Sequence, residues 1–577
     1  MAKAISIKNL TFRYKDQKDA NAIENINLDI EKGQFVVIMG PSGGGKSTLA
    51  HCLNGLIPHF IRGKFSGQVL VNGKDTKDYS VSKMAKEIGL VFQDFEAQLF
   101  STNTKLEIAF GPENFNVARE EIGRRLKQVL KVVKLEGLED RQPSTLSGGQ
   151  KQRLAIGSVL ASKPNIVCMD EPTTDLDPVG KIGVFTIAKE LHQDSDLTLI
   201  IIEHETEEAL NADRLIIMEK GRIIQDGSPR ELLREVELMD RIGLMPLQVP
   251  KYFSKVTSLQ KDELPLTPEE GLQKFKSLNL KLNDKEYEKI LEEDKKREKS
   301  YGDVLIEVKA LEHTYPNGKT ALKGIDLTIR EGEFLAIIGH NGSGKTTLVK
   351  HFNGLLLPTK GNVIVEGKNT KEASIFEIGK TVGYAFQNPD HQIFANTVYE
   401  EVAFSPKIRG ASEEEIEERV KEALKAVDME GFEEEDPFTL TKGQRQRIAV
   451  ASILSARPKV IILDEPTTGL DFKGQKQMME LIKKLNENGH TIIMITHTMW
   501  VVAEYAHKVG IINDGQLVMY GSTREVFSRE EELLNYNLKV PHIVSFSNSL
   551  GKTLLSLDEM IRCTERGVAN GYVPVSG

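Results

Sequence analysis

Hydrophobic and polar residues alternate along the stretch from Ala4 to Tyr14, where Ile5, Ile7 and Leu10 can face a core. Alternation with a period of two predicts a β-strand. The same pattern returns from Val304 to Tyr315. A second copy of the opening element is therefore expected in the second half of the chain.

Short continuous apolar runs follow in both halves: Phe35–Met39, Ile166–Asp170 and a run that ends before Glu203; then Phe334–Ile338, Val460–Asp464 and a run that ends at Thr496. Runs of this length without interruption favour buried strands. Charged amphipathic segments at residues 120–136 and 412–430 predict surface helices of a small helical subdomain. Both halves thus contain the same succession of elements.

A glycine-rich segment follows the first buried run of each half. It reads Gly-Pro-Ser-Gly-Gly-Gly-Lys-Ser-Thr from Gly40 to Thr48 and Gly-His-Asn-Gly-Ser-Gly-Lys-Thr-Thr from Gly339 to Thr347. Both fit the phosphate-loop pattern and open onto a helix-like segment, which is the setting that the pattern requires. Glycine lets the backbone fold tightly, so that N–H groups and a helix N-terminus converge on phosphate oxygens. Two such matches indicate nucleotide binding.

The residue types in these loops assign roles. Lys46 and Lys345 are expected to neutralise the β- and γ-phosphates of ATP, and the hydroxyls of Ser47 and Thr346 to ligate Mg²⁺. The predicted ATP-binding residues of the loops are Gly40, Ser42, Gly43, Gly45, Lys46, Ser47, Thr48, Gly339, Asn341, Gly342, Gly344, Lys345, Thr346 and Thr347. Tyr14 and Tyr315 precede the loops by similar distances and are candidates to stack on adenine; the alternative is an ordinary aromatic residue at a strand end.

Each half also carries Asp-Glu-Pro-Thr-Thr after its second buried run, at Asp170-Glu171 and Asp464-Glu465. An aspartate at a strand end beside a phosphate loop can hold Mg²⁺ through water, and the adjacent glutamate can orient an attacking water. The third run leads to His204 in one half and His497 in the other. A histidine at the same strand end in both halves is a candidate γ-phosphate contact.

Two further motifs occur in each half of the chain. An apolar strand ends in a glutamine in both halves, Gln93 and Gln387, and later come Leu-Ser-Gly-Gly-Gln at Leu146–Gln150 and Leu-Thr-Lys-Gly-Gln at Leu440–Gln444. This series of motifs resembles the ATP-binding cassette ATPases over residues 4–230 and 304–525. The resemblance implies an α/β fold with two P-loop NTPase cassettes, each a RecA-like core with an antiparallel β subdomain and a helical subdomain. It also implies ATP hydrolysis, with the two glutamines contributing to catalysis and to Mg²⁺ binding.

The glutamine segments, Phe92–Phe100 and Phe386–Phe394, are similar to those of the energy-coupling-factor branch, whose ATPases drive uptake of vitamins and transition metals. That resemblance implies two partners, a transmembrane coupling subunit and a substrate-binding membrane component, and a peripheral location at the cytoplasmic face of the cell membrane. The two segments are candidate docking surfaces, with buried loop packing as the alternative. The substrate itself cannot be chosen from these residues.

In the resembling family, two cassettes pair head to tail, and each ATP lies between the phosphate loop of one and the signature segment of the other. Two cassettes in one chain would make this dimer intramolecular. The signature residues expected to bind nucleotide are Ser147, Gly148, Gly149 and Gln150, then Thr441, Gly443 and Gln444. Lys442 departs from the family pattern, because it stands where glycine would let the backbone approach closely. We hypothesise that the site combining Glu465 with Ser147–Gln150 is the faster one.

The predicted domain organisation is a first cassette at 1–230, its helical extension at 231–280, a charged linker at 281–303, a second cassette at 304–525 and a C-terminal extension at 526–577. The linker is dense in Glu, Lys and Asp and is expected to be a solvated helix.

The composition of the chain disfavours some classes of protein. The 577 residues carry a net charge of −9, which disfavours nucleic-acid binding. The three cysteines are scattered, which suits a reducing compartment, and neither a signal peptide nor a run long enough to span a bilayer is visible. Alternatives to the energy-coupling-factor interpretation are a fused ATPase of another importer class, such as a sugar transporter, a soluble two-cassette translation factor, and a nucleotide switch that barely hydrolyses ATP.

Overall fold

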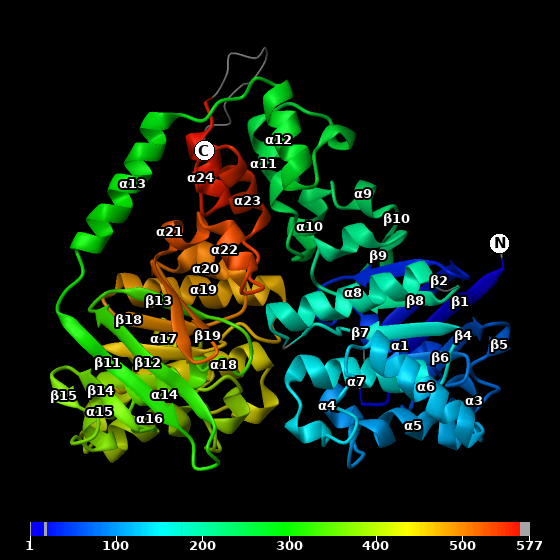
Figure 1. Cartoon of the computed structure of the whole chain (residues 1–577), viewed down its shortest axis with the longest axis horizontal. Helices are drawn as coiled ribbons and strands as arrows, with labels where there is room; N and C mark the ends of the chain where they lie inside the picture. The colour runs from blue at the N-terminus through cyan, green and yellow to red at the C-terminus, as the bar shows by residue number, and fades with distance from the viewer. Residues whose placement is uncertain (1, 17–19, 175, 195, 566–577) are drawn as a thin grey trace. The chain divides into compact units, whose positions relative to one another are not determined.

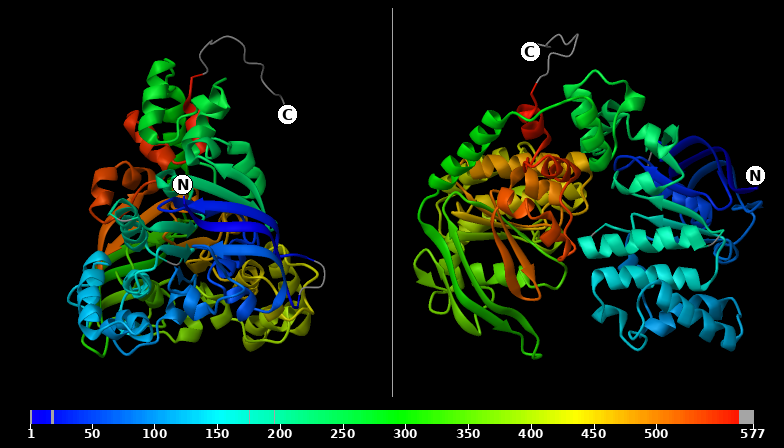
Figure 2. Two further views of the ribbon diagram at one scale, coloured as in Figure 1. Left: turned by 90° about the vertical axis from the view of Figure 1, so that its right-hand side faces the viewer. Right: turned by 45° about the horizontal axis from the view of Figure 1, so that its top comes forward.

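The computed structural model describes residues 2–16, 20–174, 176–194 and 196–565. The chain divides into two compact units. The first comprises the residues up to Lys251 together with Leu259–Leu266, and the second comprises Tyr252–Ser258 together with the residues from Thr267 onward. Each unit has its own sheets with helices packed around them (Figures 1 and 2).

Two sheets form the first unit within the described ranges. The four-stranded antiparallel sheet has the order β2-β1-β4-β5, with β1 at Lys3–Tyr14, β2 at Ile23–Glu31, β4 at Gly63–Val71 and β5 at Lys74–Asp75. The six-stranded sheet has the order β10-β9-β3-β8-β7-β6, with β3 at Phe35–Met39, β6 at Ile88–Val91, β7 at Ile166–Asp170, β8 at Thr198–Ile202, β9 at Arg214–Glu219 and β10 at Arg222–Gly227. Strands β3, β6, β7, β8 and β9 are parallel, so their carboxyl ends meet at one edge.

The second unit repeats this architecture, strand by strand, where the structure describes it. Its four-stranded sheet has the order β12-β11-β14-β15, with β11 at Val304–Thr314, β12 at Thr320–Arg330, β14 at Lys360–Val365 and β15 at Lys368–Asn369. Its six-stranded sheet has the order β16-β17-β18-β13-β19-β20, with β13 at Phe334–Ile338, β16 at Val382–Ala385, β17 at Val460–Asp464, β18 at Thr491–Ile495, β19 at Lys508–Asn513 and β20 at Gln516–Ser522.

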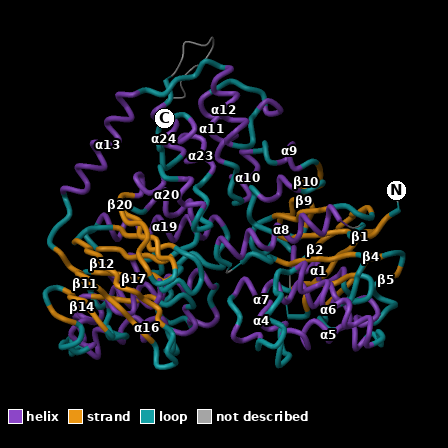
Figure 3. Tube along the Cα trace, in the orientation of Figure 1, coloured by secondary structure: helices purple, strands orange, loops and turns teal. Residues whose placement is uncertain are grey.

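Helices surround these sheets (Figure 3). In the first half they are α1 Lys46–Leu53, α2 Leu56–His59, α3 Val81–Met84, α4 Phe95–Gln98, α5 Thr104–Asn114, α6 Arg119–Val132, α7 Gly148–Ala161, α8 Pro178–Asp194, α9 Pro229–Leu232, α10 Val236–Ile242, α11 Gln248–Val256, α12 Pro268–Ser277 and α13 Asp284–Lys299. In the second half they are α14 Lys345–Phe352, α15 Ile375–Thr381, α16 Val398–Ile408, α17 Glu413–Ala426, α18 Lys442–Leu454, α19 Phe472–Glu487, α20 Met499–Tyr505, α21 Thr523–Phe527, α22 Glu530–Leu534, α23 His542–Ser549 and α24 Leu557–Cys563. The predicted amphipathic helices are α6 and α17.

The continuous apolar runs are central strands with both faces covered. In β3, Val37 and Met39 belong to one hydrophobic cluster, whereas Val36 and Ile38 belong to another. Successive side chains of a strand point to opposite faces, so a strand buried on both faces shows no polar alternation. The predicted α/β fold with two P-loop cassettes is confirmed.

The segment expected to be an extension of the first cassette is shared between the two units. Helices α9 and α10 lie in the first unit, whereas Tyr252–Ser258 and α12 belong to the second. There, Tyr252 and Phe253 pack with Phe546 of α23 at ring-centroid distances of 5.6 and 5.9 Å, and Tyr252 Oη lies 2.7 Å from Thr564 Oγ1. Burial of these aromatic rings joins the two expected extensions in one core. Residues 566–577 of the predicted C-terminal extension lie outside the described residues.

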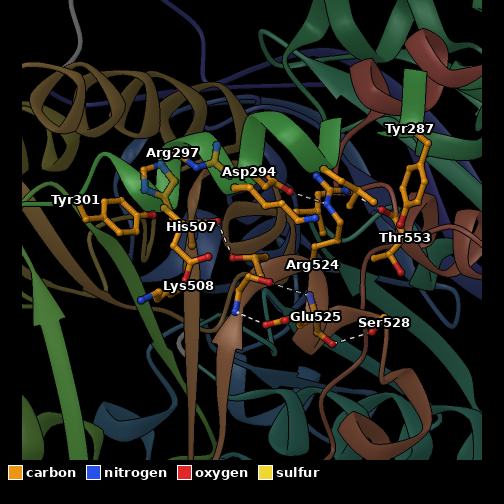
Figure 4. A pocket seen from close by; sticks show the side chains of 17 residues that line it. Tyr287, Asp294, Arg297, Tyr301, His507, Lys508, Arg524, Glu525, Ser528 and Thr553 are labelled. Carbon is orange, nitrogen blue, oxygen red and sulfur yellow. Dashed lines mark hydrogen bonds and ion pairs between the residues drawn. The ribbon is translucent and has the colours of Figure 1, made fainter. Parts of the chain in front are cut away.

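The charged linker forms helix α13, which is attached to the second unit by ion pairs. Arg524 is 6% exposed and donates from Nε to Asp294 of α13 at 2.7 Å and from Nη2 to Glu559 at 2.8 Å. A cavity of about 340 Å³ lies alongside, where Tyr301 stacks on His507 with centroids 6.1 Å apart (Figure 4). The helix predicted from composition is present, and its charges form specific contacts as well as meeting solvent.

Candidate nucleotide and magnesium site

Both phosphate loops connect a central strand to a helix and wrap around their own lysine. Lys46 Nζ donates to Gly40 O at 2.8 Å and to the carbonyl of Pro41 at 3.0 Å. Lys345 repeats this with Gly339 O at 2.8 Å and the next carbonyl at 2.9 Å. The loops therefore have the closed turn that presents N–H groups to phosphate.

The last glycine before each lysine is required by the backbone. Gly45 has φ +93° and Gly344 has φ +112°. A Cβ on Gly45 would lie 2.6 Å from Ala22 O, and one on Gly344 would lie 2.8 Å from Ala321 O. Both the left-handed conformation and the close approach of a neighbouring strand exclude larger residues here.

The two tyrosines predicted to stack on adenine lie beside their loops. Tyr14 Oη is 2.9 Å from Thr48 Oγ1, and Tyr315 Oη is 3.0 Å from Thr347 Oγ1. Each contact ties the end of the antiparallel sheet to the first turn of the helix after the phosphate loop. The stacking itself stays a prediction.

The two aspartates end β7 and β17, and their carboxylates lie near the loop hydroxyls. Burial raises the pKa of Asp170 to about 6, and the charge of Glu171 contributes in the same direction. A hydrogen bond from Ser47 lowers the pKa but does not offset the burial. Burial also raises the pKa of Asp464, whose Oδ2 lies 3.4 Å from Thr346 Oγ1. Hydroxyl and carboxylate oxygens thus lie close together in both cassettes, and their binding of Mg²⁺ stays a prediction.

Both glutamates occupy a strained backbone conformation. Glu171 has φ 47° and Glu465 has φ 53°, the left-handed region that few residues other than glycine adopt. Each residue follows directly on a buried strand. Strain of this kind costs on the order of 1–3 kcal/mol and persists where surrounding contacts enforce it. The conformation is therefore held at the same point in both cassettes.

The predicted histidines contact these glutamates. His204 Nε2 lies 2.8 Å from Glu171 Oε1, and His497 Nε2 lies 2.7 Å from Glu465 Oε1. Burial alone would raise the pKa of each glutamate, but the histidine hydrogen bond and charge, together with the nearby loop lysine, lower it overall. Both carboxyls are thus kept ionised, as orientation of a water molecule requires.

The glutamines differ between the cassettes. Gln93 Nε2 donates to Glu171 Oε2 at 2.8 Å. Between the described residues Gln387 and Glu465 there is no corresponding hydrogen bond. Instead His497 Nε2 also lies 3.1 Å from Asn341 Oδ1 of the phosphate loop. The same motifs are therefore joined by different contacts.

The signature segments begin helices α7 and α18. Ser147 Oγ accepts from Gln150 N at 3.3 Å while Gln150 Oε1 accepts from Ser147 N at 2.9 Å, which is a capping box. Thr441 and Gln444 form the same box in the second cassette. In the part of the chain that the structure describes, no hydrogen bond joins either segment to the phosphate loop of its own cassette.

Comparison with known proteins identifies the chain. Residues 23–174 and 322–468 both match the family model described as ABC transporter. The chain belongs to the ABC transporter family. ABC transporter ATP-binding domains are ATPases that bind ATP, generally with Mg²⁺, and work with transmembrane components. The chain is accordingly an ATP-hydrolysing enzyme.

Relatives match over nearly the whole length. A protein of Caldanaerobacter subterraneus subsp. tengcongensis named "Putative ABC transporter ATP-binding protein" is 72% identical over 98% of this chain and 99% of its own. A Methanosarcina acetivorans protein of the same description is 42% identical over 92% of this chain and 87% of its own. The solved structure of cbiO1 from Clostridium perfringens, described as part of the ABC transporter complex cbiONQ, is 37% identical, with a TM-score of 0.38, over 42% of this chain and 97% of its own.

The oxygen groups of this ABC ATPase fit Mg²⁺. Asp170 is 3% exposed, and its Oδ1 has no hydrogen-bond partner within the described ranges. A buried carboxylate oxygen without a partner is costly unless a ligand or water satisfies it. Hard oxygen ligands from one carboxylate and one hydroxyl, completed by phosphate and water, are what Mg²⁺ prefers.

Three contacts of the ABC site were not foreseen from the sequence. Thr174 donates to Glu171 at 3.3 Å, and Thr468 donates to Glu465 at 3.0 Å. The repeated Asp-Glu-Pro-Thr-Thr motif contained that signal. Tyr384 Oη donates to Asp464 Oδ2 at 2.7 Å, and this contact has no counterpart in the motifs. Of the residues that the structure describes, none lies in a helix both long and apolar enough to cross a bilayer.

Proposed function

We propose that this chain is the ATP-hydrolysing subunit of an importer of the energy-coupling-factor type. It drives uptake of a vitamin or a transition-metal ion through a separate transmembrane coupling subunit and a substrate-binding membrane component. It works peripherally at the cytoplasmic face of the cell membrane. The proposal rests on the docking surface beside the glutamine segment, which recurs in both cassettes.

The surface consists of a pair of exposed phenylalanines in each cassette. Phe100 and Phe110 meet edge to face with centroids 4.6 Å apart, and Phe394 and Phe404 meet likewise at 4.7 Å. Their exposed fractions are 62%, 45%, 60% and 44%. Clustered apolar side chains in solvent mark interaction sites. A largely apolar cavity of about 300 Å³ beside Phe100 supports a helical segment of a partner as the occupant.

Buried carboxylates hold these exposed rings in place. Glu107 Oε2 accepts from the backbone N of Phe100 at 3.1 Å and of Ser101 at 2.7 Å. Glu401 Oε2 does the same for Phe394 and the next residue, at 3.0 and 3.1 Å. Both glutamates are 3% exposed. The rings are presented by a braced loop, which favours docking over loop packing.

The docking segment continues into the catalytic site. Gln98 Oε1 accepts from Phe92 N at 3.1 Å, and the following Gln93 bonds to Glu171 at 2.8 Å. A partner that moves the phenylalanine pair therefore acts on the glutamate through a short braced segment. This gives a physical route between the membrane component and hydrolysis.

We infer that each ATP is bound by the phosphate loop of one cassette and the signature segment of the other. One site would combine Lys345, Asp464, Glu465 and His497 with Ser147–Gln150, and the other Lys46, Asp170, Glu171 and His204 with Thr441–Gln444. The loop lysines bind phosphate, the glutamates orient water and the histidines hold the glutamates. Bound Mg²⁺ supplies charge neutralisation of the phosphates.

Affinity purification of the tagged chain from gently solubilised membranes tests the proposal. The expected result is recovery with one transmembrane coupling subunit and a small substrate-binding membrane protein. Phe100→Ser combined with Phe394→Ser should abolish that recovery, whereas Leu534→Ser, which changes a leucine that is 55% exposed in α22, should not.

Other outcomes would overturn the proposal. Recovery with paired permeases and a soluble binding protein would indicate another importer class. Recovery with ribosomal proteins would indicate a translation factor. Unchanged recovery by the double phenylalanine variant would refute the docking surface even if the partners are those expected.

A further inference from the structure

A tyrosine at the end of strand β16 contacts the carboxylate expected to hold Mg²⁺ in the second cassette. Tyr384 Oη donates to Asp464 Oδ2 at 2.7 Å. The tyrosine ring packs edge to face on Phe386 with centroids 5.1 Å apart and lies against the hydrophobic core. These contacts restrain the ring and therefore the position of its hydroxyl.

The second hydroxyl near Asp464 comes from the phosphate loop. Thr346 Oγ1 lies 3.4 Å from the same Oδ2 atom. Asp464 is 6% exposed, so bulk water has little access to it. Two hydroxyls from different elements therefore restrain one oxygen of a buried carboxylate, and the orientation of the whole group is limited before any cation binds.

The first cassette has a leucine in the equivalent place. Leu90 of β6 pairs with Cys168 of β7, two residues before Asp170. Tyr384 pairs with Ile462 of β17 in the same register, two residues before Asp464. A leucine side chain has no hydrogen-bond donor, so Asp170 accepts a hydrogen bond from the phosphate-loop residue Ser47 but has no counterpart of the Tyr384 hydroxyl at the leucine position.

We propose that Tyr384 is a positioning residue for divalent-cation binding in the second cassette. It holds the Asp464 carboxylate in a fixed orientation, so that the second phosphate loop binds the cation with nucleotide more tightly than the first. The proposal rests on the expected role of Asp464 as a Mg²⁺ ligand through water. Groups that orient a ligand of a metal change its affinity about 10- to 100-fold when removed.

The experiment measures binding of Mn²⁺, as a Mg²⁺ probe, by electron paramagnetic resonance in the presence of a non-hydrolysable ATP analogue. The full chain is used, and Lys46→Ala is added to weaken nucleotide binding by the first phosphate loop, so that the signal comes from the second. Tyr384→Phe should weaken Mn²⁺ binding about 10-fold or more. The affinity of the Tyr384→Phe variant for the ATP analogue, measured with a chelator present, should not change, because the Tyr384 hydroxyl contacts the Asp464 carboxylate and not the phosphate loop.

A matched control is Tyr505→Phe, which removes another tyrosine hydroxyl that donates to a carboxylate, at 2.7 Å from Glu480. It should leave Mn²⁺ affinity unchanged. The reverse exchange, Leu90→Tyr in a chain with Lys345→Ala, should tighten Mn²⁺ binding by the first loop. The unfolding temperature of each variant shows that the fold is kept.

Asp464→Asn separates the two assumptions. If it weakens Mn²⁺ binding while Tyr384→Phe leaves it at the wild-type value, the role of Tyr384 is refuted and that of Asp464 stands. If neither substitution changes Mn²⁺ binding, the metal role of Asp464 fails and the proposal fails with it. Equal loss in Tyr384→Phe and Tyr505→Phe would also refute a specific positioning role.

Discussion

Glu171 and Glu465, the two glutamates predicted to be catalytic, lie in identical Asp-Glu-Pro-Thr-Thr motifs but have different neighbours. Glu171 is contacted by His204 at 2.8 Å and by Gln93 at 2.8 Å. Glu465 is contacted by His497 at 2.7 Å, and that histidine also contacts the phosphate loop. Because phosphoryl transfer depends mainly on positioning and electrostatics, we expect such differences to give the two sites different rates of hydrolysis.

The signature segments differ more strongly. Lys442 occupies the place that Gly148 has in the first cassette, and it lies against Gly469, where a Cβ would come within 2.3 Å of Lys442 Nζ. The lysine is therefore accommodated because Gly469, with φ +71°, has no side chain. Two copies of one fold have kept the chemistry of the phosphate loop while its surroundings diverged.

The largest expected difference concerns the glutamates. If the site that uses Glu465 is the faster one, Glu465→Gln should slow hydrolysis at that site about 100- to 10,000-fold, because a carboxylate that orients water is lost, and total ATP turnover should fall to that of the other site. Glu171→Gln should cause a smaller loss. Turnover is measured as steady-state phosphate release by each single variant. Equal losses of turnover would contradict the asymmetry between the two sites.

The attachment of helix α13 distinguishes the second unit. Arg524→Met should lower the free energy of unfolding by about 3–5 kcal/mol, because it leaves the partly buried Asp294 and Glu559 without their cation. The matched control is Arg562→Met, whose arginine side chain is 44% exposed and pairs with Glu293; the expected cost is about 1 kcal/mol or less. Chemical denaturation measures the free energy of unfolding of both variants. Similar losses would show that Arg524 does not attach helix α13 more strongly than an exposed ion pair does.

Exchange of the signature residues tests the hypothesis about Lys442. Gly148→Lys should lower turnover by up to about 100-fold, the size of effect that a displacement of about 1 Å produces. Lys442→Gly should raise turnover. A rise in turnover with Gly148→Lys would mean that the lysine assists phosphate binding instead of obstructing closure.

The smallest effect concerns pH. His542 follows Pro541 in the second half, whereas Lys251 follows Pro250 in the first half. Burial, together with the charge of Lys539, lowers the pKa of His542 to about 4. Below a pH of about 6.5, the unfolded chain takes up a proton that the folded chain does not, so stability falls as pH falls towards 4. His542→Asn should remove about 2 kcal/mol of the stability difference between pH 7.5 and pH 5.0. Denaturant unfolding at both values checks this, and an unchanged difference would exclude His542 as its source.

Much of the fold and of the site could be predicted because both are written in local patterns. The phosphate loop needs glycines at particular positions whatever surrounds them, so Gly45 and Lys46 were recognisable from their neighbours alone. The buried strands were recognisable because a strand covered on both faces must be apolar throughout. The repetition of every motif placed the two cassettes.

The boundary between the cassettes could not be read in this way. Tyr252 and Phe253 follow the first cassette in sequence, yet they pack with Phe546 nearly 300 positions later. Composition predicted that α13 would be a charged helix, but not that Asp294 would meet a buried Arg524. Packing between distant segments decides such contacts, and no local pattern encodes their partners.

The sequence alone determined the phosphate-binding chemistry, the strand-loop-helix setting of each loop and the repetition of the cassette. Only the tertiary structure placed the hydroxyl of Tyr384 on Asp464, because the contact depends on how β16 pairs with β17. A shift of that pairing by one residue would turn Tyr384 to the opposite face of the sheet. Motifs specify which groups a site contains, whereas strand register specifies which of them meet.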